Sequence, residues 1–281
     1  IAPDNMASRS QNPKWSPDGK FIAYMSDKSG RDEIWITDPD GKSPKQITNL
    51  DNEKGAMQWT PDSKALVYTA ADKKLYSYSV ADAKTATVTT DSVSRFIGNF
   101  SISSDSKWVA FSKQDRTLRS HVYVAPITGG EGRHVSDDRV LYSEANPVWT
   151  GDGRHLVFTS SEGFSNGIAT QGGITTTTEL WATPLRDQER DPLNRDVDNE
   201  AQALAAAAGA AGGRAGGAGG NAVPAVQIDW NNIARRARQI PLPGDSINGL
   251  IASPEGRSVA FNLSTAGGGA AGTGGIYIVN V

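Results

Sequence analysis

The sequence predicts an all-β fold, a β-propeller of four-stranded blades, and three observations lead to this prediction. A turn motif of the type Pro-Asp-Gly recurs along the 281 residues. Each copy is followed by a short apolar run that ends in an aromatic residue, and then by two more strand-like segments, or by one in the last copy. A repeat of this length with four short strands has the spacing of a propeller blade.

The turn motif repeats around one acidic residue. From Asp18, the next copies follow at intervals of 44, 43 and 47 residues, and a fifth lies 103 residues beyond the fourth. Proline presets one backbone angle, the acid can cap its own turn, and the Gly or Ser that comes next tolerates a positive φ, so the motif predicts a tight hairpin turn. The acids are Asp18, Asp62, Asp105, Asp152 and Glu255, and the bases two places later are Lys20, Lys64, Lys107, Arg154 and Arg257.

The segment after each turn has the composition of a buried strand. An aliphatic, a small apolar and an aromatic residue stand four, five and six places past the acid, and such nearly continuous runs are typical of strands covered on both faces. In the first copy we expect Trp15, Ile22 and Tyr24 to pack one blade against the next. The aromatic column is Tyr24, Tyr68, Phe111, Phe158 and Phe261.

Two further strands are expected in each of the first four repeats, and one in the fifth. The first of them carries aromatic residues, and we expect it at 33–36, 75–78, 121–124, 179–182 and 276–279. A shorter last strand is expected at 45–48, 86–89, 133–136 and 238–241. The predicted blades lie near 12–50, 56–91, 99–137, 146–243 and 247–281, the last one incomplete. Because an open ring leaves strand edges unpaired, we favour part of a larger ring, while closure of a small ring by residues 1–9 stays open.

The fourth blade contains an insertion at about 186–225. Much of it, residues 203–223, is rich in Ala and Gly, and such a segment buries too little surface to offset its ordering entropy. We therefore expect it to be flexible, with at most a marginal helix around 199–208. A second tract of this kind, 265–275, lies inside the fifth blade.

The composition argues against several classes of protein. The formal net charge of −3 provides no basic field for nucleic acid, and no apolar run approaches the roughly 20 residues that span a bilayer. The chain has no cysteine, which excludes disulfides and thiolate chemistry. It begins at Ile1 without a signal pattern, so we expect a processed chain or a piece of a longer one.

The polar residues predict no catalytic, cofactor-binding or metal-ligating residue. His121, His134 and His155 are assigned to different units, which argues against a metal cluster. The acids of 26–33 and 38–42 lack the spacing of a calcium loop, the Gly-rich runs lack the end of a phosphate loop, and no Gly-x-Ser-x-Gly elbow occurs. We interpret "GDS" (244–246) as a turn, and both the five turn bases and "RRAR" (235–238) as solvated charges.

Two stretches carry a family resemblance. "NPKWSPDGKFIAYMSDKSGRDEIWITDPDG" (12–41) resembles the TolB-like and tricorn-like propeller repeat and lacks the Gly-His and Trp-Asp signatures of WD40 repeats. "VQIDWNNIARRARQIPLPGDS" (226–246) resembles the segment that follows a blade insertion in tricorn-like serine proteases. In that family the insertion belongs to a seven-bladed propeller, so the resemblance implies that the blades are part of such a ring.

The resemblance implies a non-catalytic module of a peptidase. The propeller would gate or guide oligopeptides to a serine protease site in C-terminal domains of the same parent chain, and no catalytic residue is carried over to this chain. Two alternatives stay open, a TolB-like protein-interaction propeller without activity and the propeller of a prolyl-oligopeptidase-type hydrolase. The expected partners are peptide substrates and the protease domains, with self-association left open and no nucleic acid. The compartment stays open between a bacterial cytoplasm and periplasm.

Overall fold

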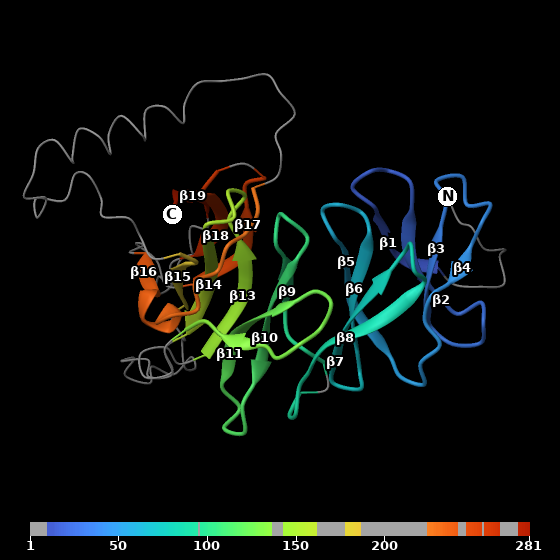
Figure 1. Ribbon diagram of the computed structural model, residues 1–281, viewed down its shortest axis with the longest axis horizontal. Coiled ribbons are helices and arrows are strands. Elements are labelled where there is room, and N and C mark those ends of the chain that lie inside the picture. Colours follow the sequence, from blue (N-terminus) through green and yellow to red (C-terminus); the bar gives the residue numbers. More distant parts are fainter. Residues whose placement is uncertain are drawn as a thin grey trace, which may run out of the picture.

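The computed structural model describes residues 10–94, 96–136, 143–161, 178–186, 224–240, 246–254, 256–264 and 275–281. These residues form five antiparallel sheets, four of four strands and one of three. Figure 1 shows the sheets following one another in chain order, from the blue sheet of β1–β4 at one end of a curved row to β17–β19. The predicted all-β propeller of four-stranded blades is confirmed.

The strands of each blade are consecutive in the sequence, and each pairs with its neighbour in an up-and-down order. In chain order they are β1 (Ser10–Trp15), β2 (Ile22–Ser26), β3 (Glu33–Thr37), β4 (Lys45–Gln46), β5 (Lys54–Trp59), β6 (Ala65–Ala70), β7 (Lys74–Ser79), β8 (Lys84–Thr90), β9 (Phe100–Ile102), β10 (Trp108–Gln114), β11 (Ser120–Pro126), β12 (Arg133–His134), β13 (Ser143–Trp149), β14 (His155–Ser161), β15 (Thr178–Pro184), β16 (Arg238–Ile240), β17 (Ser246–Ala252), β18 (Ser258–Ser264) and β19 (Gly275–Asn280). We number the blades one to five in the same order.

The predicted turns join the first two strands of each blade. In the first copy, Ser16 N donates to Phe21 O at 2.8 Å and Gly19 N donates to Ser16 O at 2.9 Å. Asp18 Oδ1 accepts a hydrogen bond from Ser16 Oγ at 2.8 Å, so the acid caps its own turn. The small residue after the acid has a positive φ in every copy, at Gly19, Ser63, Ser106, Gly153 and Gly256.

The second strand of each blade supplies the core. The aromatic column predicted for these strands is buried in all five blades. Its members face aromatic residues of the third strand: Tyr68 stacks on Tyr76 with ring centroids 5.3 Å apart, and Phe111 stacks on Tyr123 at 6.1 Å. The aromatic columns of the second and third strands therefore form one packed layer across each blade.

The tryptophan before the turn is buried only where another blade precedes it. The Trp59 indole donates to Lys14 O of the first blade at 2.9 Å, and the Trp149 indole donates to Ser101 O of the third at 3.2 Å. Trp15 is 56% exposed, so the expectation that it packs between blades is wrong, whereas Ile22 and Tyr24 are buried as predicted. The reason is that no sheet precedes the first one in the described part of the chain.

The turns also tie successive blades together. Asp18 N donates to Ser63 Oγ at 2.9 Å, and Asp62 N donates to Ser106 Oγ at 3.0 Å, so each hydroxyl accepts from the preceding turn. The turn bases of the first four blades are exposed, as predicted. Arg257 departs from that prediction in part, because its Nε lies 3.1 Å from Asp152 Oδ2 and so bridges the fourth and fifth blades.

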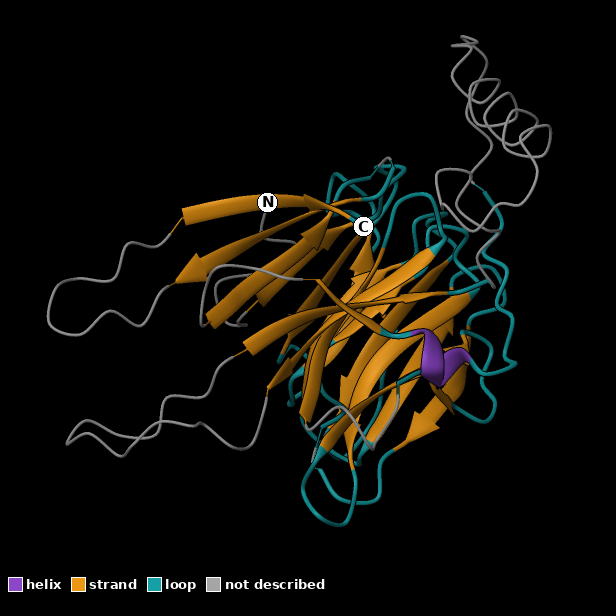
Figure 2. Ribbon diagram, turned by 90° about the vertical axis from the view of Figure 1, so that its left-hand side faces the viewer, coloured by secondary structure: helices purple, strands orange, loops and turns teal. Residues whose placement is uncertain are grey.

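The segment 224–240 returns across the junction of the third and fourth blades. Val226 N donates to Asp105 Oδ2 at 2.9 Å, and the Val226 side chain joins the core of this junction. The segment contains a short 3-10 helix, η1 (Ile233–Arg236), shown in purple at the edge of the strands in Figure 2. Arg236 lies 2.7 Å from Asp229 with only 12% of its side chain exposed, so solvation is the wrong interpretation for this member of the "RRAR" cluster.

Several predictions fall outside the described residues. They concern Glu255, residues 1–9, the Ala/Gly-rich tract 203–223, all but the last residue of 265–275, and most of the "GDS" turn. Among the helices of the described residues, none is long and apolar enough to cross a membrane.

Candidate functional site

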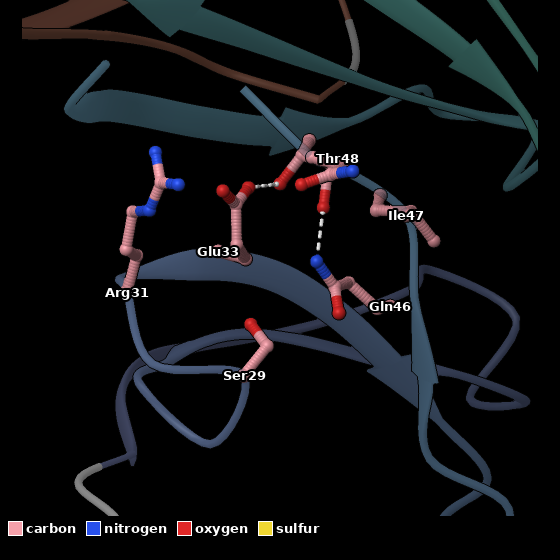
Figure 3. Close-up of a pocket in the computed structure, with 7 residues that line it drawn as sticks. Ser29, Arg31, Glu33, Gln46, Ile47 and Thr48 are labelled. Atoms are coloured by element: carbon pink, nitrogen blue, oxygen red, sulfur yellow. Dashed lines mark hydrogen bonds between the residues drawn. The ribbon is translucent and has the colours of Figure 1, made fainter. Parts of the chain in front are cut away.

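A polar hollow of about 460 Å³ is lined by residues of the first blade. Glu33, the first residue of β3, lies between Arg31 and Gln46 (Figure 3). The hollow is lined by Ser29, Arg31, Glu33, Gln46, Ile47, Thr48 and Asn49. These residues come from the β2–β3 connection, the start of β3, β4 and the residues that follow it, at the end of the blade away from the turn at Asp18.

The Glu33 carboxylate is fully engaged inside the protein. Thr48 Oγ1 donates to Glu33 Oε2 at 2.5 Å, and Leu50 N donates to Oε1 at 3.2 Å. Lys54 Nζ, on the first strand of the second blade, lies 2.7 Å from the same Oε1, and the two side chains are 1% and 3% exposed. This buried ion pair joins the first and second blades.

The rim of the hollow carries the accessible polar groups. The Arg31 guanidinium is largely exposed and pairs with the exposed Asp51. Gln46 Nε2 donates to Thr48 O at 2.6 Å. A cation and amide groups at the mouth of a polar hollow suit a small anionic or hydrogen-bonding ligand such as the end of a peptide.

At the position equivalent to the Glu33–Lys54 pair, the third and fourth blades carry the acid and the basic group on the opposite blades. His121 stands two residues before the third-strand aromatic, as Glu33 does, and Glu144 stands five residues before the first-strand tryptophan, as Lys54 does. Ser136, two residues beyond the short last strand, corresponds to Thr48. The acid is thus on the other blade, and imidazole replaces the lysine.

Glu144 is the centre of this second cluster. Its side chain is completely buried, Val122 N donates to Oε2 at 2.7 Å, and Ser136 Oγ donates to the same oxygen. Burial alone would raise the pKa of the Glu144 carboxyl, but His121, His134, Ser136 and the Val122 N–H lower it to about 2. The carboxylate is therefore ionised at neutral pH.

The two histidines meet at this carboxylate. His121 Nδ1 lies 3.9 Å from Glu144 Oε1, and His134 Nε2 lies 3.8 Å from Glu144 Oε2. The two imidazole rings are 5.1 Å apart, centroid to centroid. The assignment of His121 and His134 to different units was wrong, because they stand on the paired strands β11 and β12 of one sheet.

His155 lies apart from them on β14. Burial lowers the pKa of its imidazole, and its backbone N donates to Thr150 Oγ1 at 3.0 Å. It therefore belongs to the packing of the fourth blade. The column two residues before each third-strand aromatic holds Glu33, Lys74, His121, Glu179 and Gly275, so it indicates polar positions without distinguishing His121 and Glu33 from the others.

A comparison with family models settles the family. A model described as the TolB beta propeller domain (PD40) matches residues 4–190, well over half of the chain. The chain belongs to the TolB beta propeller family. The match confirms the family predicted from the turn repeat at 12–41, and it covers both junction clusters.

Individual relatives of this TolB-type propeller include a Tol-Pal system protein and a dipeptidyl-peptidase. The chain is 36% identical over 84 residues to the Tol-Pal system protein TolB of Ruthia magnifica subsp. Calyptogena magnifica, an alignment covering 28% of this chain and 20% of the relative. It is 28% identical over 171 residues to dipeptidyl-peptidase 5 of Porphyromonas endodontalis, covering 58% of this chain and 24% of the relative. The alignments thus span about a fifth to a quarter of these relatives.

Among solved structures, the tricorn protease is similar to this TolB-type propeller over 97% of the chain, which covers 26% of the tricorn chain. The TM-score is 0.68 and the sequence identity 15%, so this likeness concerns the fold. It agrees with the expectation, drawn from the tricorn-like residues of the sequence, that the chain has a propeller like that of such peptidases.

Proposed function

We propose that this chain is the propeller module of a peptidase and that it guides oligopeptides to a serine protease site in another part of the parent protein. The observation that carries the proposal is the relationship to dipeptidyl-peptidase 5, whose alignment with this chain takes up 24% of that peptidase. The 0.68 TM-score to a quarter of the tricorn protease supports the same assignment.

Exposed apolar side chains on the first and fifth blades support the proposal that this propeller is part of a larger protein. Trp15 is exposed on the first blade, and Ile251, Ile276 and Ile278 are 67%, 79% and 73% exposed on the fifth. Exposed aliphatic side chains gathered on one sheet mark a contact surface. We propose that further blades or the protease domains of the parent protein cover these surfaces, within a seven-bladed ring.

The polar hollow at Glu33 supplies a place for the peptide. Arg31 at its rim would attract the carboxylate end of an oligopeptide, while the Glu33–Lys54 pair beneath it holds the two blades in place. Such a site binds substrate without taking part in the chemical step, so its loss weakens binding more than turnover.

The test compares the isolated chain with the full-length parent protein on fluorogenic oligopeptides. We expect turnover by the parent protein and none by the isolated chain. In the parent protein, Arg31→Gln should raise KM for peptides with a free carboxylate and leave kcat unchanged, whereas Lys20→Gln, an exposed turn charge on the same blade, should change neither. Turnover by the isolated chain that disappears when one of its own serines is replaced would contradict the proposal.

A second candidate function is a protein-interaction propeller like TolB. The 36% identity to a Tol-Pal system protein favours it. In that case the parent protein would show no turnover of any oligopeptide, with or without the Arg31→Gln change. The peptidase assay on the parent protein therefore separates the two candidates.

A further inference from the structure

We propose that His121, His134 and Glu144 form a zinc-binding site at the junction of the third and fourth blades. The site is separate from the polar hollow at Glu33, and the proposal does not depend on the peptidase function. Its three ligands come from β11, β12 and β13, so a bound ion would join two blades through their side chains.

The spacing of the ligand atoms suits a small tetrahedral ion. One ligand atom from each of the three residues lies within 4.8 Å of the other two. With bonds of about 2.0–2.2 Å, two ligands of a tetrahedral zinc ion lie about 3.3 Å apart. His121 Nδ1 lies 3.9 Å from Glu144 Oε1, and His134 Nε2 lies 3.8 Å from the other carboxylate oxygen, Oε2. Each distance exceeds this value by about half an ångström, so small rotations of the imidazoles and of the carboxylate would bring the three groups onto one ion.

A carboxylate supports the first histidine from behind. His121 Nε2 lies 3.4 Å from Asp115 Oδ2, on the side of the ring away from Glu144. An N–H donated from the second ring nitrogen to a carboxylate fixes the tautomer and orientation of a zinc-bound histidine. Here it would leave Nδ1 directed toward Glu144.

Glu144 has an oxygen available for an ion. Oε2 already accepts from Val122 N and Ser136 Oγ, whereas Oε1, which faces His121, accepts no hydrogen bond from any described residue. A buried carboxylate oxygen in this state is costly unless a cation compensates for it. At the first junction the cation is the ammonium of Lys54, and at this junction a metal ion between the imidazoles would take its place.

The ligand set selects the metal. Two imidazole nitrogens and one carboxylate oxygen are ligands of zinc, whereas magnesium and calcium take sets of oxygens. His134 keeps 23% of its side chain exposed, which gives the ion a path from solvent. A water molecule would complete the coordination, since the Ser136 hydroxyl donates to Glu144 Oε2.

The test is zinc titration of the full 281-residue chain by isothermal calorimetry, with competition against a chromophoric chelator. We expect one equivalent to bind, and the melting temperature to rise with zinc concentration as for any ligand that binds the native state. Magnesium chloride should give neither effect. Losing an outer-shell partner costs about 10–100-fold in metal affinity, so Asp115→Asn should weaken zinc binding in that range.

The ligand variants decide the outcome. His134→Gln removes a direct zinc ligand and should therefore weaken zinc binding by more than about 100-fold. His155→Gln, the control, should leave zinc binding unchanged. His134 lies on a short edge strand, so its variant is expected to fold even where Glu144→Gln does not, and melting without zinc verifies this. No binding, or equal binding by the wild type and His134→Gln, would overturn the proposal and leave a plain histidine–carboxylate ion pair.

Discussion

Replacing Lys54 by Met should be among the most destabilising single changes in this propeller. The ammonium lies 2.7 Å from Glu33 Oε1, and both side chains are almost wholly buried. At that distance, with an effective dielectric constant of about 20, the direct attraction is about 6 kcal/mol, part of which offsets the cost of dehydrating the two charges. Removing one partner of a buried pair leaves the other charge uncompensated and typically costs about 3–5 kcal/mol.

The assay is urea denaturation followed by tryptophan fluorescence, with two controls. Glu33→Gln combined with Lys54→Met removes both charges and should restore most of the lost stability, because a buried pair contributes little more than a neutral replacement of similar shape. Lys64→Met breaks the exposed contact with Asp62 and should cost no more than about 1 kcal/mol. A Lys54→Met variant no less stable than Lys64→Met, or a double variant no more stable than Lys54→Met alone, would refute the reasoning.

Three further changes test the packing and charges described above. Trp149→Ala should cost about 3–5 kcal/mol in the same urea assay because a buried indole is lost, whereas Trp15→Ala, on an exposed side chain, should cost much less. Ser63→Ala should cost about 1 kcal/mol, since its hydroxyl accepts from Asp18 N. The pKa of Glu144 falls from 4.5 to about 2 on folding, so its contribution to stability is present above pH 4.5 and is lost as pH falls toward 2. Glu144→Gln should therefore flatten the pH dependence of melting over that range, measured in chelator.

The features that recur in every blade could be predicted from the sequence. The turn around Asp18 follows from local chemistry, since a proline, a capping acid and a small residue suffice to specify it. The buried aromatic column that includes Tyr24 follows from the apolar run after each turn. Both depend on residues within one repeat, and five aligned copies reduce the ambiguity of any one of them.

What escaped prediction depends on contacts between blades. The burial of a first-strand tryptophan requires a preceding blade, so Trp15 is exposed although Trp59 and Trp149 are buried. The pairing of Glu33 with Lys54 joins residues of two repeats, and charged residues in a strand are ordinarily expected to face solvent. The approach of His121 and His134 to Glu144 likewise joins residues of two repeats, so no single repeat indicates it.

The junction of the third and fourth blades departs from the repeat at both ends of its strands. At the turn end, the fourth copy has Gly153 where the second and third have serines that accept from the preceding turn, and Val226 N binds Asp105 there instead. At the other end, Glu144 and two imidazoles replace the carboxylate–ammonium pair of the first junction. Residues that recur in every blade are accounted for by the fold alone. Val226 belongs to the segment that follows the long insertion, so a residue from outside the repeat holds this junction at its turn end, while Glu144 and the two imidazoles at the other end offer the ligand set proposed above.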